Sequence, residues 1–164
     1  MLLAKLENYE LSDSQIKNGL KKALLGSIEL SGYAKYILER NGNTTLSLGL
    51  YSFAIGEYGK YEILREFLSE SVKRHHIPKV IFDVKNFKIN FKKALDTLPR
   101  SITENLSNDL SLDLQSKMSY FNLTWDQEKE KWNAPPKIDS SLLSESLISF
   151  EKHVSVKLDS EYDS

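Results

Sequence analysis

The feature of this chain that most restricts its fold is the spacing of apolar residues between Asn43 and Lys79. Apolar side chains recur there at steps of three and four residues, which places them on one face of an α-helix. The pattern therefore predicts one long helix that ends in a cluster of basic residues. The predicted apolar face consists of Leu46, Leu50, Phe53, Ala54, Tyr61, Leu64 and Leu68.

Two charged residues, Glu57 and Lys60, fall on or beside this apolar face. A carboxylate and an ammonium group three residues apart on a helix can touch, so each offsets part of the other's desolvation. One interpretation is a pair in a pocket that orients a substrate hydroxyl or phosphate. The other is a structural ion pair, within the protein or across a dimer interface, and the pattern leaves both open.

Capping signals place another helix directly before the long one. Ser12 can accept amide hydrogens of a first turn, and Asn41 and Gly42 are typical of a left-handed helix end. The connection to the long helix is short, which predicts antiparallel neighbours. Glycine is costly inside a helix unless two backbones approach closely. Gly56 and Gly59 therefore predict a tight crossing of these two helices.

The remaining chain predicts further helices and one irregular insertion, because Pro78 ends the long helix. We expect an all-α, HEPN-like bundle of about five helices, with a single domain over residues 1–158 and a flexible acidic tail over 159–164. The expected segments after Pro78 are a short helical or irregular segment (79–84), helices over 86–98 and 102–121, a loop or small two-stranded excursion with Trp125 and Trp132 (122–137), a helix capped by Asp139, and a frayed end from Lys157.

Charge is distributed unevenly along the chain. The segment from Lys73 to Arg100 contains eight basic and two acidic residues, whereas acidic residues predominate from Asp139 onwards. The basic stretch suggests a surface for phosphates, and its other reading is an ordinary solvated helical face. As RNA-binding residues the sequence suggests Lys73, Arg74, Lys85, Lys88 and Lys92.

Several classes of site and location are disfavoured by composition. The chain has no cysteine, which excludes disulfides, thiolate metal sites and cysteine nucleophiles. No apolar run approaches the length of a bilayer, and the first residues do not resemble a signal peptide. We therefore expect a cytoplasmic protein with no membrane association, no metal and no cofactor.

His75 and His76, with Lys79 close behind, form the second candidate constellation. A histidine among cations can act as a general base, while lysine or arginine stabilises charge on a phosphorus centre, as metal-independent RNA cleavage requires. The same residues are also typical of an ordinary helix C-terminus. On a straight helix Glu57 and His76 would lie roughly 28 Å apart. Only a kink or a two-fold partner could unite them, and His153 is expected to be a packing or surface residue.

Several stretches, in order, resemble the AbiV-type abortive-infection proteins of the HEPN superfamily. The segment SFAIGEYGKYEIL (52–64) resembles that family's A-x-E-E-x-G-K-x-x-L helix, and NGLKKALLGSIELSGYAKYILERN (18–41) its first helix. HHIPK (75–79) is similar to its H-x-x-K segment. Residues 117–120 and 132–135 resemble its stretch of basic residue, tyrosine, tryptophan and proline. Gly56 replaces the first of the paired family glutamates.

The resemblance implies a helical, homodimeric protein of prokaryotic antiphage defence that shuts down protein synthesis. Many HEPN proteins are metal-independent ribonucleases with an R-x(4–6)-H motif, which this chain lacks, so enzyme activity stays open. The positions that match the family's motifs are Glu57, Lys60, His76 and Lys79, and the expected site consists of Glu57, Lys60, His75 or His76, and Lys79. The alternatives are a non-catalytic module that binds a phage or host protein, and an antitoxin-like partner of a nucleotidyltransferase.

Overall fold

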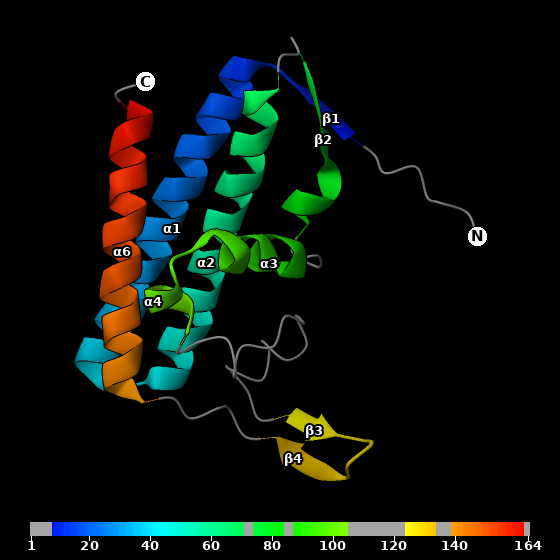
Figure 1. Cartoon of the computed structure of the whole chain (residues 1–164). Helices are drawn as coiled ribbons and strands as arrows, with labels where there is room; N and C mark the ends of the chain where they lie inside the picture. Colours follow the sequence, from blue (N-terminus) through cyan, green and yellow to red (C-terminus); the bar gives the residue numbers. More distant parts are fainter. Residues whose placement is uncertain (1–7, 71–73, 84–86, 105–123, 134–138, 163–164) are drawn as a thin grey trace.

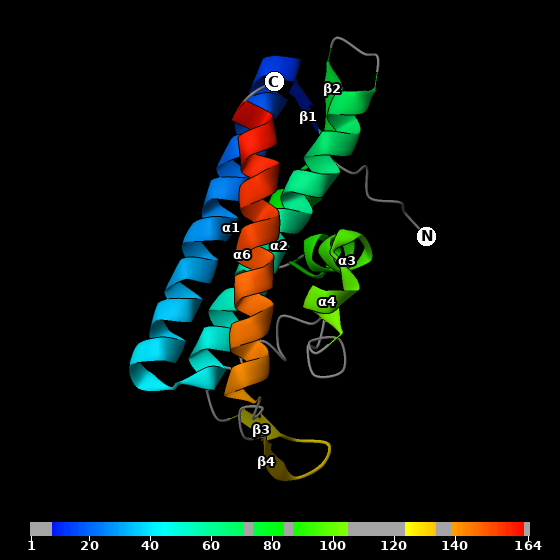
Figure 2. The same cartoon turned by 60° about the vertical axis from the view of Figure 1, so that its left-hand side comes forward.

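Three long helices, α1 (Asp13–Asn41), α2 (Thr44–Ser69) and α6 (Ser140–Tyr162), run side by side and form the body of the protein (Figures 1 and 2). The computed structural model describes residues 8–70, 74–83, 87–104, 124–133 and 139–162. Two shorter helices, α3 (Phe87–Thr97) and α4 (Arg100–Thr103), lie beside α2 and α6. The predicted all-α bundle of about five helices is confirmed for this part of the chain.

The two ends of α1 follow the capping signals. Ser12 Oγ accepts a hydrogen bond from the Gln15 amide, and Gln15 Oε1 accepts one from the Ser12 amide at 2.9 Å. Gly42 adopts the left-handed conformation with φ of 61°, and its amide donates to the Leu38 carbonyl. Asn43 then caps α2 by accepting from the Leu46 amide at 3.0 Å. The predicted short antiparallel connection is therefore confirmed.

Helix α2 is the central element, because it packs against α1, α3 and α6. Its buried residues surround the helix instead of following one stripe, so the prediction of a single apolar face is wrong. Leu46, Leu50, Phe53 and Leu68 are only half-buried, whereas Tyr51 and Tyr58 are fully buried.

Two buried hydroxyls connect α1 to α2. Ser27 Oγ donates to the Ala54 carbonyl at 2.8 Å, and Ser47 Oγ donates to the Ala34 carbonyl at 2.7 Å. Each serine belongs to one helix and its acceptor to the other. The two helices can therefore approach closely around small side chains without leaving a buried hydroxyl unsatisfied.

Gly56 and Gly59 do mark a close approach, but to α3 and not to α1 as predicted. A Cβ atom on Gly59 would overlap the backbone carbonyl of Asn90, and one on Gly56 would overlap the ring of Phe87. The absence of a side chain at these two positions lets α3 lie directly on α2. Asn90 in turn donates from Nδ2 to the Ile81 carbonyl at 2.6 Å, which holds α3 against the preceding segment.

The predicted continuation of the long helix to His76 is wrong. Helix α2 ends at Ser69, and strand β2 (His75–Pro78) pairs antiparallel with β1 (Asn8–Leu11). His75 and Ile77 are buried while His76 is exposed, as expected for the alternation of a strand. A short 3-10 helix, η1 (Lys79–Phe82), follows and agrees with the predicted short helical segment.

The second sheet is the predicted two-stranded excursion. Strand β3 (Thr124–Asp126) pairs antiparallel with β4 (Lys131–Asn133), and Trp125 lies opposite Trp132 in the register. Most of the helix predicted over 102–121 lies outside the described residues, and α4 accounts for its beginning. None of the described helices combines the length and the apolar character needed to cross a membrane.

Asp139 begins the last helix as predicted, because its Oδ1 accepts from the amides of Ser141 and Leu142 at 2.8 and 3.1 Å. The expected fraying from Lys157 is wrong, since α6 continues to Tyr162. Residues 159–162 of the predicted flexible tail are thus helical. Glu161 even accepts a hydrogen bond from Tyr61 Oη at 3.0 Å, so the end of α6 is attached to α2.

Candidate functional site

Glu57 and Lys60 form the ion pair that their spacing suggested. Lys60 Nζ lies 2.5 Å from Glu57 Oε1, and the side chains are 25% and 30% exposed, respectively. The Glu57 stem lies beside α1, where a Cβ on Gly26 would come within 3.9 Å of Glu57 Cγ. The pair is therefore partly shielded by protein but remains open to solvent.

His75 and His76 face opposite sides of β2 and differ in what they can reach. The His75 imidazole is fully buried, with Nε2 2.8 Å from Asp13 Oδ1 at the start of α1, while its buried Nδ1 has no hydrogen-bond partner among the described residues. The His76 side chain is 64% exposed, and its Nδ1 lies 3.9 Å from Glu10 Oε1. Only His76 is therefore placed to contact a macromolecule in solution.

Lys79 follows β2 and lies near an aromatic ring. Its Nζ is 5.0 Å from the centre of the Tyr9 ring, a cation–π distance. The five predicted site residues thus belong to two groups with different neighbours: Glu57 and Lys60 contact each other on α2, whereas the histidines and Lys79 contact residues near the N-terminus. A single chain holds these groups in separate elements.

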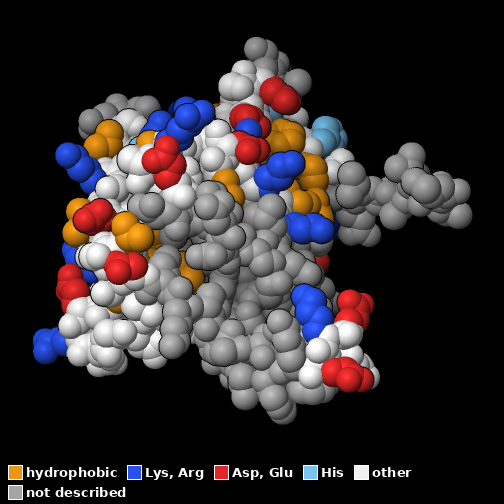
Figure 3. All heavy atoms as spheres, turned by 60° about the horizontal axis from the view of Figure 1, so that its bottom comes forward, with side chains coloured by type: hydrophobic (Ala, Val, Ile, Leu, Met, Phe, Trp, Pro, Cys, Tyr) orange, Lys and Arg blue, Asp and Glu red, His pale blue; other side chains and the backbone are white. Residues whose placement is uncertain are grey.

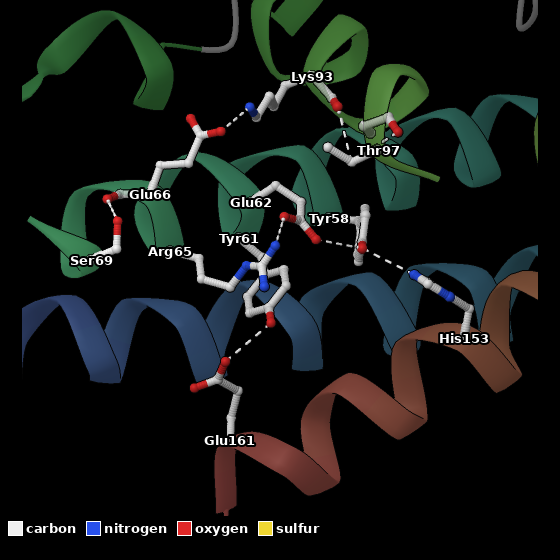
Figure 4. Close-up of polar contacts among 11 residues, drawn as sticks. Tyr58, Tyr61, Glu62, Arg65, Glu66, Ser69, Lys93, Thr97, His153 and Glu161 are labelled. Atoms are coloured by element: carbon white, nitrogen blue, oxygen red, sulfur yellow. Dashed lines mark hydrogen bonds and ion pairs between the residues drawn. The ribbon is translucent and has the colours of Figure 1, made fainter. Parts of the chain in front are cut away.

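A third polar cluster, which the sequence analysis did not identify, is centred on Glu62 (Figure 4). Glu62 is only 2% exposed. Its Oε1 accepts a hydrogen bond of 2.6 Å from Tyr58 Oη, and its Oε2 lies 2.8 Å from Arg65 Nη2. A buried carboxylate requires such partners, because an unpaired charge would be costly to desolvate.

His153 on α6 extends this cluster across the helix interface (Figure 4). Its Nε2 lies 3.0 Å from Tyr58 Oη, and the two rings pack edge to face at 5.5 Å. Because the Tyr58 hydroxyl gives its single proton to the Glu62 carboxylate, His153 Nε2 must carry the hydrogen of the second bond. Of the two roles expected for His153, packing or surface, the structure shows packing, and it adds a hydrogen bond.

Burial is the main influence on the acid–base properties of this cluster. It raises the pKa of Tyr58, and the hydrogen bond to Glu62 raises that pKa further. Burial also lowers the pKa of His153 from its ordinary value of 6.5, and the charge of Lys157 lowers it further. Both groups are therefore neutral near pH 7, and the cluster holds one carboxylate balanced by Arg65.

The signal for this cluster was present in the sequence only in part. Tyr58, Glu62 and Arg65 follow at steps of four and three residues, which places them on one side of a helix. The prediction of a single apolar stripe directed attention to Glu57 instead. His153 lies 95 residues from Tyr58 in the sequence, and no local pattern connects the two.

The basic residues predicted to bind RNA are exposed where the structure describes them. Lys88 and Lys92 are exposed on α3, and the Arg74 side chain is 75% exposed, 3.6 Å from Glu10 Oε2. Lys93 on the same helix pairs with Glu66 of α2. Figure 3 shows Lys and Arg side chains beside a band of hydrophobic side chains on one face of the molecule. Lys73 and Lys85 lie outside the described residues.

Comparisons of the chain with protein-family models, with curated proteins and with solved structures found no match. Within the residues that the structure describes, no group of three or more histidine or carboxylate side chains is arranged to hold a metal ion. The arrangement of side chains and the order of the sequence motifs are therefore the basis for assigning a function.

Proposed function

We propose that this protein is a cytoplasmic, homodimeric antiphage protein that acts on RNA or on the translation machinery of the infected cell. The order of its motifs, which resembles that of AbiV-type HEPN proteins, supports this assignment. The all-α bundle with two antiparallel N-terminal helices is compatible with the resemblance. The proposal has two parts: the protein binds RNA, and it cleaves the bound RNA.

The observation that carries the RNA-binding part is the exposure of cationic side chains after α2. Arg74, Lys88 and Lys92 all extend into solvent, and among the described residues neither Lys88 nor Lys92 has a carboxylate partner. Between Lys73 and Arg100 basic residues outnumber acidic ones four to one. Such an excess attracts a phosphate backbone, and the attraction weakens as salt is added.

Cleavage would use His76, because it is the exposed histidine of the basic segment. A neutral His76 would remove the proton of a ribose 2′-hydroxyl, whose oxygen then bonds to the adjacent phosphorus. The 5′ oxygen would leave with a proton from Lys79 or water, while Arg74 stabilises the charge on the phosphate oxygens. The buried His75 would position His76 by holding β2 against the start of α1 through Asp13.

Glu57 and Lys60 enter this site only through the second chain of the homodimer. They lie on α2, and they contact each other and not the histidines. A two-fold axis can bring this pair of one protomer toward the basic segment of its partner. In that arrangement Lys60 would contact phosphate and Glu57 would orient a ribose hydroxyl.

The experiment combines RNA binding and RNA cleavage in the presence of EDTA. Labelled single-stranded RNA of mixed sequence is incubated with the wild type and with His76→Ala, binding is followed by fluorescence anisotropy and products by gel electrophoresis. We expect both proteins to bind with similar affinity and only the wild type to cleave. Binding without cleavage by the wild type would leave a non-catalytic RNA-binding protein, and absence of binding to any RNA would refute the proposal.

A second candidate function is a non-catalytic module that binds a phage or host protein. The observation in its favour is the outer face of α1, where Leu25, Tyr33 and Tyr36 are exposed and a shallow depression is lined by Glu29, Gly32 and the two tyrosines. Contiguous exposed apolar residues mark interaction surfaces. The same face is available to a second copy of the chain.

Light scattering after size-exclusion chromatography distinguishes dimerisation through the α1 face from its use in binding a different protein. If the face joins two protomers, Tyr33→Ser/Tyr36→Ser converts a dimer into a monomer. A wild-type monomer would leave the face to a different protein and would remove the homodimer from the main proposal.

A further inference from the structure

Two aromatic residues distant in sequence meet at the surface next to the basic segment. Tyr9 of β1 and Phe82 of η1 pack edge to face, with ring centres 5.8 Å apart and an angle of 62° between the rings. They are 46% and 39% exposed, respectively. Large aromatic side chains usually hide more of their surface, so an open pair of rings requires an explanation.

The pairing of β1 with β2 creates this arrangement. Tyr9 lies opposite Ile77 in the register, and η1 begins directly after β2, so the ladder brings the start of the chain to Phe82. Buried Ile77 and Ile81 anchor the segment to the core from beneath. The two rings are thus carried on an anchored segment and not on a free loop end.

A lysine lies against one of the two rings, and further basic residues lie on the adjoining elements. Lys79 Nζ lies 5.0 Å from the centre of the Tyr9 ring. Arg74 lies 3.6 Å from Glu10, the residue after Tyr9, whose side chain projects from the opposite face of the strand pair. Exposed Lys88 follows on α3, which Asn90 holds against η1 through the Ile81 carbonyl. The surface therefore combines exposed aromatic rings with a lysine beside them and with further cations on the adjoining elements.

We infer that Tyr9 and Phe82 form a stacking platform for unpaired bases of single-stranded RNA, with Lys79 contacting an adjoining phosphate and Arg74 a phosphate further along the strand. This inference rests on the proposed binding of RNA and specifies the form of RNA that is bound. Aromatic side chains combined with a cationic surface are the usual means of holding single strands, because every base presents a flat face. In an A-form duplex the bases are already stacked on one another and cannot reach the rings.

Glu10 has the opposite effect on this surface. Its carboxylate lies 3.6 Å from Arg74 Nη1 and 3.9 Å from His76 Nδ1, so it competes with a phosphate for both side chains. Replacing Glu10 by Gln removes the competing charge from an exposed position. The platform thus predicts one change that weakens binding and another that strengthens it.

The test measures the affinity of the full-length protein for a labelled single-stranded oligouridine by fluorescence anisotropy. We expect Tyr9→Leu/Phe82→Leu to weaken binding about tenfold, because stacking of each base contributes appreciably to affinity. Leucine keeps the apolar volume but removes the ring. Glu10→Gln should strengthen binding severalfold. Tyr162→Leu is the matched control, because Tyr162 of α6 is an exposed tyrosine with Lys21 Nζ 4.7 Å from the centre of its ring.

A second measurement needs no altered protein. The wild type is titrated with a strand of the same length that lacks bases, and with a strand containing 2-aminopurine, whose fluorescence falls when the base stacks on an aromatic ring. We expect weaker binding of the baseless strand and quenching of 2-aminopurine. This readout stands even if the double variant does not fold.

The outcomes separate the platform from the underlying function. If the wild type binds no RNA, the proposed function fails and the platform fails with it. If it binds RNA but tolerates both substitutions and binds the baseless strand equally well, only the platform is overturned and binding by charge remains. Preference for duplex over single-stranded RNA would overturn the platform in the same way.

Discussion

Tyr58 of α2 donates its hydroxyl proton to buried Glu62 and accepts a hydrogen bond of 3.0 Å from His153 of α6, 95 residues further along the chain. The hydroxyl thus completes a connection between the central helix and the last one. It also satisfies two groups that would otherwise lose their partners inside the protein.

Replacement of Tyr58 by Phe should destabilise the fold. The substitution keeps the ring but leaves Glu62 Oε1 and His153 Nε2 without their common partner, so we expect a loss of about 1–3 kcal/mol in the free energy of unfolding. Urea denaturation measures it. Tyr33→Phe is the control, because the Tyr33 hydroxyl bonds Glu29 at the surface and its loss should be nearly neutral. Equal effects would contradict a special role for Tyr58.

The lowered pKa of His153 predicts a dependence of stability on pH. The unfolded chain binds a proton to this histidine near its ordinary pKa of 6.5, whereas the folded protein does so only at lower pH. Its contribution to stability is therefore complete above pH 6.5 and declines as the pH falls from there through the folded-state pKa.

Urea denaturation at several pH values compares the wild type with His153→Gln. We expect the wild type to lose more stability on acidification than the variant does, because the variant lacks the titrating group. The difference between the two proteins removes the contributions of other histidines. If both proteins respond equally to pH, the titration belongs elsewhere.

Gly59 and Gly32 offer a matched pair of substitutions. Alanine at Gly59 would overlap the Asn90 carbonyl of α3, so we expect a destabilisation of about 2 kcal/mol or more. Alanine at Gly32 would meet no atom of the described residues within 4 Å and should stabilise α1 by up to about 1 kcal/mol. Thermal unfolding followed by circular dichroism measures both. A neutral Gly59→Ala would mean that α3 can move away from α2.

Glu57 and Glu62 differ in burial and should therefore differ in their contribution to the free energy of unfolding. Glu62→Gln weakens a buried bond to Arg65, so we expect a loss of about 2 kcal/mol in the free energy of unfolding. Glu57→Gln alters a partly exposed ion pair and should cost less than about 1 kcal/mol. If RNA cleavage by the wild type is abolished in a stable Glu57→Gln variant, Glu57 is functional and not structural.

Local signals predicted the helices well because caps act over a few residues. Ser12 caps the start of α1 and Gly42 its end, and Asp139 precedes α6, as their side chains and backbone preferences require. The strand β2 could not be predicted in this way. Its pairing with β1 joins Leu11 to His75, and the periodicity of neither segment reveals the other.

The candidate site was predicted less well for the same physical reason. A single apolar stripe assumes one buried face, but α2 packs on three sides, so Glu62 is buried while Glu57 reaches solvent. The close approach at Gly59 was predicted correctly, but its partner on α3 was not. A glycine in a helix indicates that another element lies close by, but it does not indicate which element that is. Lys88 was predicted from charge, and His76 from its acid–base chemistry and the family resemblance; both are exposed, on separate elements.

The pairing of β1 with β2 also closes the two N-terminal helices into a ring. Helices α1 and α2 are joined at one end by the turn at Gly42 and fastened at the other by four residue pairs between Asn8–Leu11 and His75–Pro78. The ladder cross-links the N-terminal end of α1 to the C-terminal end of α2, so these two ends can separate only if the strand pairs break. We therefore expect that removal of residues 8–11 would let the ends of α1 and α2 separate more easily.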